Sequence, residues 1–428
     1  MQTSISSAPR AVDPILIVAM FLLPSTMGLI GGAASGIFIL VFLLSLPNVL
    51  LNAPVQISSL ARPHIVQVFL LLAIVGIAGL GLINTTDTQQ YWSRFERLAR
   101  ALGCILIFLY FVGYKVSLTR AFELGLLPAS VFVFIVSLQQ SRSFGWAEGA
   151  YNTILFGDFS AYLACAAAVG MLSYRGRPVM VLAFFLGAVM SVNASILSGT
   201  RGAWVAMYLG LSLVLVVWLL SIRHKVGLAG AVALGASILT SATWLLTLHP
   251  IVSSRTNDAI ATFMQFFSGG DPNTSVGQRL QMWQAATKIW ATNPLLGSGL
   301  GDYSIDLASL MKTGASSMNS HFGEAHSLYF EFLSTTGLLG LAMIVLGLFV
   351  MPAYIFARSG VFSEKHQSPT FSARLHGLIL IVVFFSFGLT QNWLGRSSIS
   401  SVFFLCLAVF WADVVVKGKP GGEPGPGA

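Results

Sequence analysis

Residues 203–222 read AWVAMYLGLSLVLVVWLLSI and contain no charged side chain. A transmembrane helix needs about 20 such residues, because each residue advances it about 1.5 Å through a hydrocarbon layer about 30 Å thick. The whole chain has this character: 55% of its 428 residues are hydrophobic and only 9% are charged. Soluble globular proteins have roughly 25% charged residues. The sequence therefore predicts an all-α polytopic membrane protein and excludes a soluble globule.

Apolar runs of similar length occur about twelve times, and the longest polar stretch separates the ninth run from the tenth. We expect transmembrane helices 1 to 9 in residues 1–249, a large loop with short helices in 250–326, transmembrane helices 10 to 12 in 327–416 and a disordered cytoplasmic tail in 417–428. The runs lie near residues 14–31, 33–51, 65–83, 101–117, 122–139, 152–172, 178–197, 203–222, 226–248, 328–356, 375–391 and 397–416.

The basic residues set the expected orientation, because short cytoplasmic loops are enriched in Lys and Arg. With the N-terminus inside, about thirteen of the 23 basic residues fall on the cytoplasmic side. Arg94, Arg97 and Arg100 oppose this assignment unless their segment lies along the membrane interface. We expect both termini inside and the 250–326 loop outside. The net charge of +8 then reflects contact with anionic membrane lipids and not nucleic acid, since the basic residues are scattered through short loops.

The sequence has no recognisable metal or disulfide pattern. Cys104, Cys165 and Cys406 fall in separate apolar runs, as small buried side chains commonly do. His321 and His326 are five residues apart, a spacing that does not align two ligands on one helical face. The outer loops also lack an Asp-x-Asp pair that could hold a metal with diphosphate. We therefore expect neither a metal nor a cofactor.

His326 lies in the sequence EAHSLY, where the large loop meets the apolar run 328–356. Histidine exchanges protons near neutral pH, and this loop is the only stretch long enough to build an aqueous site. A histidine at such a boundary is also commonly an interfacial hydrogen-bonding residue, so both interpretations stay open here. No Gly-x-Ser-x-Gly motif accompanies it, which disfavours an intramembrane protease.

Two arginines beside apolar runs need an anion or water, because a guanidinium stays charged. Arg201 lies in the short turn SGTRG, where it either meets a ligand or anchors the run to lipid headgroups. Arg279 begins a predicted helix over 278–292, whose positive dipole end favours phosphate. The tryptophans of that helix alternatively indicate a helix lying on the bilayer surface. Asp158, inside a run, belongs either to the site or to a structural pair with an outer arginine.

Three groups of motifs follow one another along the chain: LSGTRGAW at 197–204, RLQMW at 279–283 with NPLLGSGLG at 293–301, and AHSLY at 325–329 with TGLLG at 336–340. Their order, with a large loop between late apolar runs, resembles the O-antigen ligase and polymerase superfamily of bacterial envelopes. The resemblance covers about residues 150–400. The glycines of 297–301 lack the strand and helix of a nucleotide loop, so we expect a flexible turn there.

The resemblance implies a glycosyltransferase that moves a glycan from undecaprenyl diphosphate to an acceptor. The site would face the periplasm from the bacterial inner membrane. By motif position, His326 corresponds to the catalytic histidine, and Arg201 and Arg279 correspond to arginines that bind the donor diphosphate. Further candidates for substrate binding are Arg142, Arg255, Arg396, Trp283 and Tyr329.

The expected reaction is O-antigen ligation to lipid A-core in lipopolysaccharide biosynthesis, without metal and with inversion at the anomeric carbon. Polymerases often have an arginine and a glycine separated by ten residues in their periplasmic loops. No glycine lies eleven positions after any of the outer arginines Arg142, Arg201, Arg255, Arg279 and Arg396. This favours the ligase, and the polymerase is the alternative. A transporter of lipid-linked sugars is less favoured, since the chain has no visible repeat. A purely structural scaffold would tolerate replacement of the outer arginines.

Overall fold

The computed structural model describes residues 13–58, 60–316, 318, 320–358, 368 and 370–418, and every regular element within them is helical. The predicted all-α class is therefore confirmed. The predicted tail lies, beyond Gly418, outside the described residues. The elements are α1 (Asp13–Thr26), α2 (Ala33–Ser58), α3 (Arg62–Leu80), η1 (Gly81–Ile83), α4 (Thr88–Tyr114), α5 (Thr119–Phe144), α6 (Thr153–Ser173), α7 (Pro178–Leu197), α8 (Arg201–Thr247), α9 (Pro250–Phe267), α10 (Ser275–Thr292), α11 (Tyr303–Lys312), α12 (Leu328–Val345), η2 (Leu346–Val350), α13 (Met351–Ala357), α14 (Phe371–Thr390), η3 (Trp393–Gly395) and α15 (Ser397–Lys417).

Eight helices of the described residues are long and apolar enough to cross a membrane, so the protein is a multi-pass membrane protein. The predicted count of twelve spans is not confirmed. Two predicted runs, 203–222 and 226–248, correspond to the two halves of α8, which are separated at Gly227, where the backbone is not helical (φ 74°, ψ 164°). Helix α1 has only 14 residues. The first half of α4 is polar, so its apolar part is shorter than a full span.

Helices α6, α14 and α15 form the buried centre of the bundle. Lipid tails are as apolar as the side chains, so helices in a membrane associate through close packing that small residues permit. Gly125 of α5 illustrates this, because an added Cβ there would collide with the backbone of Phe21 in α1. A Cβ on Gly210 of α8 would likewise lie 2.6 Å from the Cys165 sulfur of α6.

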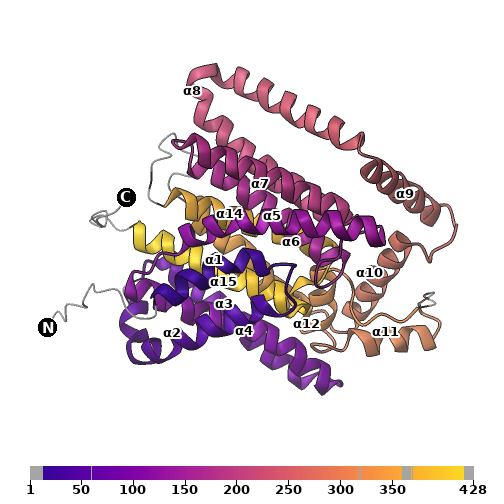
Figure 1. The fold of residues 1–428 in the computed structure, drawn as a ribbon. Helices are drawn as coiled ribbons and strands as arrows, with labels where there is room; N and C mark the ends of the chain where they lie inside the picture. Colours follow the sequence, from indigo (N-terminus) through magenta and orange to yellow (C-terminus); the bar gives the residue numbers. More distant parts are fainter. Residues whose placement is uncertain are drawn as a thin grey trace.

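Helices α9, α10 and α11 gather at one end of the bundle, beside the start of α12 (Figure 1). This end has a small core of its own, separate from the core of the membrane helices. Helix α10 begins where Thr274 caps it and ends at Asn293, close to the predicted 278–292. The buried residues of the small core are Met282, Ala285, Ala286, Ile289, Tyr303, Leu307, Met318 and Ala325. The apolar face of α10 therefore packs against protein.

Candidate active site

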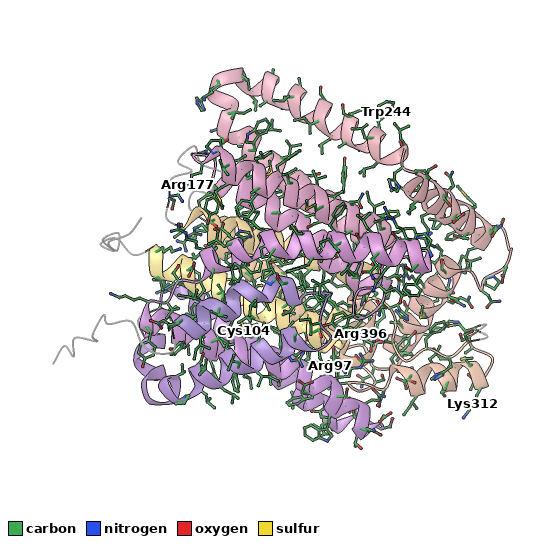
Figure 2. The ribbon with its side chains drawn as sticks, in the orientation of Figure 1. Arg97, Cys104, Arg177, Trp244, Lys312 and Arg396 are labelled. Atoms are coloured by element: carbon green, nitrogen blue, oxygen red, sulfur yellow. The ribbon has the colours of Figure 1, made fainter. Side chains whose placement is uncertain are left out.

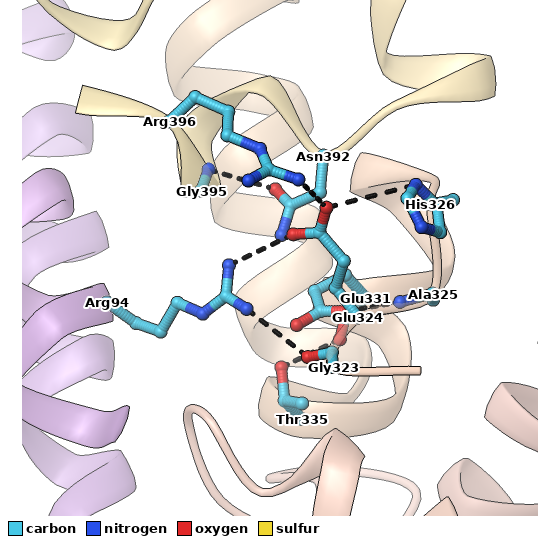
Figure 3. Close-up of polar contacts among 10 residues, drawn as sticks. All are labelled: Arg94, Gly323, Glu324, Ala325, His326, Glu331, Thr335, Asn392, Gly395 and Arg396. Atoms are coloured by element: carbon cyan, nitrogen blue, oxygen red, sulfur yellow. Dashed lines mark hydrogen bonds and ion pairs between the residues drawn. The ribbon is translucent and has the colours of Figure 1, made fainter. Parts of the chain in front are cut away.

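Glu324 is the centre of a charged cluster at the border of this end region. Its Oε1 atom lies 2.6 Å from Nη2 of Arg396, and its Oε2 atom lies 3.2 Å from Nη1 of Arg94 (Figure 3). The Nδ1 atom of His326 lies 3.9 Å from the same Oε1 atom. The Glu324 side chain is only 8% exposed, so its charge acts through little water. One carboxylate thus holds together α4, the N-terminus of α15 and the loop before α12.

The backbone of this loop fixes the position of His326. Its φ of 46° lies in the left-handed region, which costs a non-glycine residue of order 1–3 kcal/mol and persists only where neighbours enforce it. Neighbours on both sides do so here. The Ala325 N–H donates to Oε2 of Glu331 at 2.7 Å, and the Ser327 hydroxyl donates to the Gly388 carbonyl at 3.1 Å. The imidazole is therefore presented from a rigid loop.

The electrostatic surroundings of His326 favour its neutral form. Burial lowers the pKa of His326 below its usual value of 6.5; Glu324 opposes this shift, while Arg279 and Arg396 add to it. A neutral imidazole has a nitrogen that can accept a proton. The side chain is 30% exposed, so solvent or substrate can reach it. His326 is thus suited to act as a general base near neutral pH.

Arg279, in the first turns of α10, is a cation without a partner of its own. It makes no hydrogen bond or ion pair within the part of the chain that the structure describes. Burial lowers its pKa, Arg201 lowers it further, and Asp158 raises it. Asp158 lies buried in α6, and its Oδ2 atom has no hydrogen-bond partner among the described residues. Arg201 in turn interacts with Arg255 and Asp258. Three arginines thus face two carboxylates, and the net positive charge allows the site to accept an anion.

Arg201 forms hydrogen bonds with α9 and with the first residue of α10, the helix that carries Arg279. Its Nη1 atom donates to the Arg255 carbonyl at 3.2 Å, and its Nη2 atom donates to the Ser275 hydroxyl at 3.1 Å. The Arg255 guanidinium lies over the Trp146 ring, 4.3 Å from its centroid. The turn before Arg201 requires glycine at position 199. Gly199 has a φ of 69°, and an added Cβ there would lie 2.6 Å from the Trp146 ring. The structure therefore brings Arg201, Arg255 and α10 together.

Three other predicted residues have different surroundings. Arg142 lies exposed on the last turn of α5 and makes no hydrogen bond or ion pair with any described residue. Trp283 stacks on Phe330 with ring centroids 5.2 Å apart. The Tyr329 hydroxyl donates to the Phe385 carbonyl of α14 at 2.8 Å. These contacts explain Trp283 and Tyr329 as packing residues, and a role of either in substrate binding stays a prediction.

The glycine-rich turn between α10 and α11 has a structural role. Gly337 interrupts the helical dihedrals of α12 with a φ of 64°, and the turn lies against this break. The Ser298 and Gly299 N–H groups donate to the carbonyls of Ser334 and Thr335 at 3.0 Å each, and the Leu338 N–H donates to the Pro294 carbonyl at 2.9 Å. The two N–H groups of the turn are thus bonded to α12 and are not free for phosphate.

Sequence reasoning missed Glu324, Glu331 and Arg94 as parts of the site. Arg94 gave a signal, since it opposed the expected orientation, and its pairing with Glu324 now explains what neutralises it. Glu331 gave a second signal as a carboxylate inside an apolar run. Among the described residues, no group of three or more His, Cys, Asp or Glu side chains is arranged to hold a metal ion.

Comparison with known protein families gives one match. Residues 186–345 match the family model described as O-Antigen ligase. The match covers less than half of the chain and is a similarity to that family. The resemblance expected from the motifs is therefore confirmed, and the family consists of glycosyltransferase-like enzymes. The matched region contains Arg201, Arg255, Arg279 and His326, whereas Arg94 and Arg396 lie outside it.

A second comparison, with individual proteins, finds a relative over most of the chain. An uncharacterized protein of Haemophilus influenzae is 24% identical over 319 residues, which are 73% of this chain and 77% of the relative. The similarity to this relative thus extends beyond residues 186–345 to most of both chains.

Proposed function

We propose that the protein is an O-antigen ligase of the bacterial inner membrane. In this proposal it transfers a glycan from undecaprenyl diphosphate to lipid A-core at the periplasmic face, as a step of lipopolysaccharide biosynthesis. The family match supports an enzyme acting on lipid-linked glycans. The multi-pass architecture suits two substrates that are both anchored in a membrane.

The observation that carries the proposal is the combination of a neutral histidine with an unpaired cation. The pKa of His326 is lowered, in part by the positive charge of Arg279. Arg279 also interacts with Arg201, which leaves positive charge where a diphosphate would lie. A base and an anion site side by side are the two requirements of glycosyl transfer from a diphosphate donor.

The proposed reaction uses these groups directly. His326 accepts the proton of an acceptor hydroxyl, whose oxygen forms a bond with the anomeric carbon of the glycan. The bond between that carbon and the diphosphate oxygen breaks, and its electron pair leaves with undecaprenyl diphosphate. Arg201 and Arg279 stabilise the charge of the leaving group without a metal or cofactor, while Arg142, Arg255 and Arg396 assist. Attack opposite the leaving group inverts the anomeric configuration.

Glu324 is the positioning residue in this scheme. Its carboxylate lies 3.9 Å from the Nδ1 atom of His326 and also binds Arg94 and Arg396. Its negative charge therefore stabilises the imidazolium that forms when the acceptor proton is taken.

A reconstituted reaction tests the proposal. Purified protein in detergent is mixed with undecaprenyl diphosphate-linked glycan and lipid A-core, and the lipid A-core band is followed by electrophoresis. A ladder on lipid A-core supports the ligase. A longer carrier-bound glycan with unchanged lipid A-core indicates a polymerase and overturns the proposal. No transfer in detergent, with movement of the lipid-linked glycan across sealed vesicles, indicates a transporter.

A further inference from the structure

A groove lies between the first half of α8 and helices α6 and α7, with Ile238 of the second half on its wall, away from the candidate active site. The helix turns back at Gly227, and the halves pack against each other where Gly235 faces Leu219: an added Cβ at Gly235 would lie 2.6 Å from the Leu219 side chain. The second half then runs apart from the bundle towards α9 (Figure 1). Further along the second half, the Thr243 hydroxyl lies 3.5 Å from the Tyr208 hydroxyl of the first half.

The walls of this groove are apolar and come from four helices. Its volume is about 870 Å³, near the upper end of the range of about 300–1,000 Å³ for small-molecule sites. Its apolar lining residues are Ala168, Met171 and Leu172 of α6, Val181 and Phe185 of α7, Leu211, Val214, Leu215, Val217, Trp218, Ile222 and Ile238 of α8, and Phe371 of α14. Water has too few polar partners on such walls to fill the space, so hydrocarbon is the fitting content.

Three basic side chains border the same groove. Arg175, in the turn after α6, and His224 and Lys225, at the end of the first half of α8, are all exposed. No acidic residue is among the described residues that line the groove. Figure 2 shows Arg177, two residues from Arg175, at the end of the bundle opposite Lys312 of α11. The basic mouth therefore lies at the opposite end from His326 and the arginines of the candidate active site.

We propose that this groove binds one anionic phospholipid. Its phosphate lies between Arg175 and Lys225, and its acyl chains lie along the walls formed by α6, α7 and α8. Clusters of Lys and Arg beside apolar segments favour anionic headgroups over zwitterionic ones. A free phosphate matches the mouth but leaves the apolar walls empty. The diphosphate of a lipid-linked glycan matches the arginines at the other end, so this site does not depend on the proposed function.

The acyl chains also reach the second half of α8, at Ile238. The second half leads directly into α9, whose Arg255 carbonyl accepts a hydrogen bond from Arg201. A bound lipid thus supports the helix that carries one wall of the candidate active site.

The test measures lipid binding by the purified full-length protein, using native mass spectrometry with phosphatidylglycerol and with phosphatidylethanolamine of the same acyl chains. Phosphatidylglycerol is expected to bind more tightly. The double variant Arg175→Gln/Lys225→Gln should bind phosphatidylglycerol about 30-fold more weakly, from the loss of two basic contacts. The matched control, Arg62→Gln/Arg120→Gln, removes two exposed charges at the same end of the bundle outside the groove and should bind as the wild type does.

A second variant tests the walls without changing the charges. Leu215→Trp narrows the groove with a bulky ring on one wall and should weaken the binding of phosphatidylglycerol while Arg175 and Lys225 remain. Equal binding of the two lipids by the wild type would overturn the proposal. So would wild-type affinity for phosphatidylglycerol in the double variant, or undiminished binding by Leu215→Trp.

Discussion

Replacing Glu324 by Gln tests the electrostatic control of His326 most directly. The substitution keeps the shape of the side chain but removes a negative charge 3.9 Å from the Nδ1 atom. At about 4 Å, two unit charges interact by about 1 kcal/mol in water and about 4 kcal/mol at an effective dielectric constant of 20. Glu324 is shared with two arginines and the imidazole is 30% exposed, so the value near 1 kcal/mol applies. This corresponds to about one pH unit.

The sign of the effect follows from the role of His326 as a base. A protonated imidazole cannot accept the acceptor proton, so the rate of transfer falls as pH drops through the pKa of His326, which lies below 6.5 in the wild type. Because Glu324 raises this pKa, Glu324→Gln should move the acidic limb of the rate profile to lower pH by about one unit. The assay is initial rate of glycan transfer between about pH 4.5 and 8, normalised to the plateau.

Arg396→Gln is the matched control, because Arg396 lowers the pKa of His326. Its side chain is 45% exposed, so its replacement disturbs the packing little. The acidic limb should then move to higher pH. A purely structural role of the cluster would lower the rate at every pH and leave the limb in place. Two profiles that shift in the same direction, or not at all, would refute the reasoning.

Four further predictions follow from the same geometry. His326→Ala should lower the transfer rate by about 10²- to 10⁴-fold with unchanged binding of undecaprenyl diphosphate, and wild-type transfer would remove the base from the scheme. Arg279→Gln should weaken donor binding about 10- to 100-fold, measured by titration, whereas Lys312→Gln should not; equal affinities would contradict the anion site. Gly337→Ala should lower the midpoint of thermal unfolding by several degrees, because the added Cβ strains a left-handed residue and collides with the facing turn; Gly76→Ala, where the structure leaves open space, is the control and should change little. A chelator should leave transfer unchanged, and loss of activity that Mg²⁺ restores would show that the arginines do not suffice.

The motif residues of the site could be predicted from the sequence because each is coupled to a local pattern. Arg201 follows a glycine turn, Arg279 begins an amphipathic helix, and His326 precedes an apolar run. The end of α10 was predictable for the same reason, since Asn293-Pro294 directly follows it, whereas the helix begins at Ser275, before the predicted Gln278. The number of spans was less predictable, because a short apolar run, such as the one in α4 after its polar first half, does not reveal whether its helix crosses the membrane.

The partners of these residues could not be predicted in the same way. Arg94 and Glu324 are 230 positions apart, and nothing local to either residue indicates that α4 packs beside the loop before α12. The glycine-rich turn was expected as a flexible loop, yet its N–H groups bond to a break in α12 more than thirty positions further along the chain.

The sequence alone determined that the chain is an all-helical membrane protein and indicated its candidate arginines and histidine. Both follow from consecutive residues, because a membrane span needs an unbroken apolar run and each motif is local in the chain. Only the tertiary structure decided that His326 shares a carboxylate with Arg94 and Arg396 and that Arg279 has no hydrogen bond or ion pair with any residue that the structure describes. It also decided that α8 bends back to leave an apolar groove with a basic mouth. These features depend on which helices lie side by side, and that arrangement results from packing between segments distant in the chain.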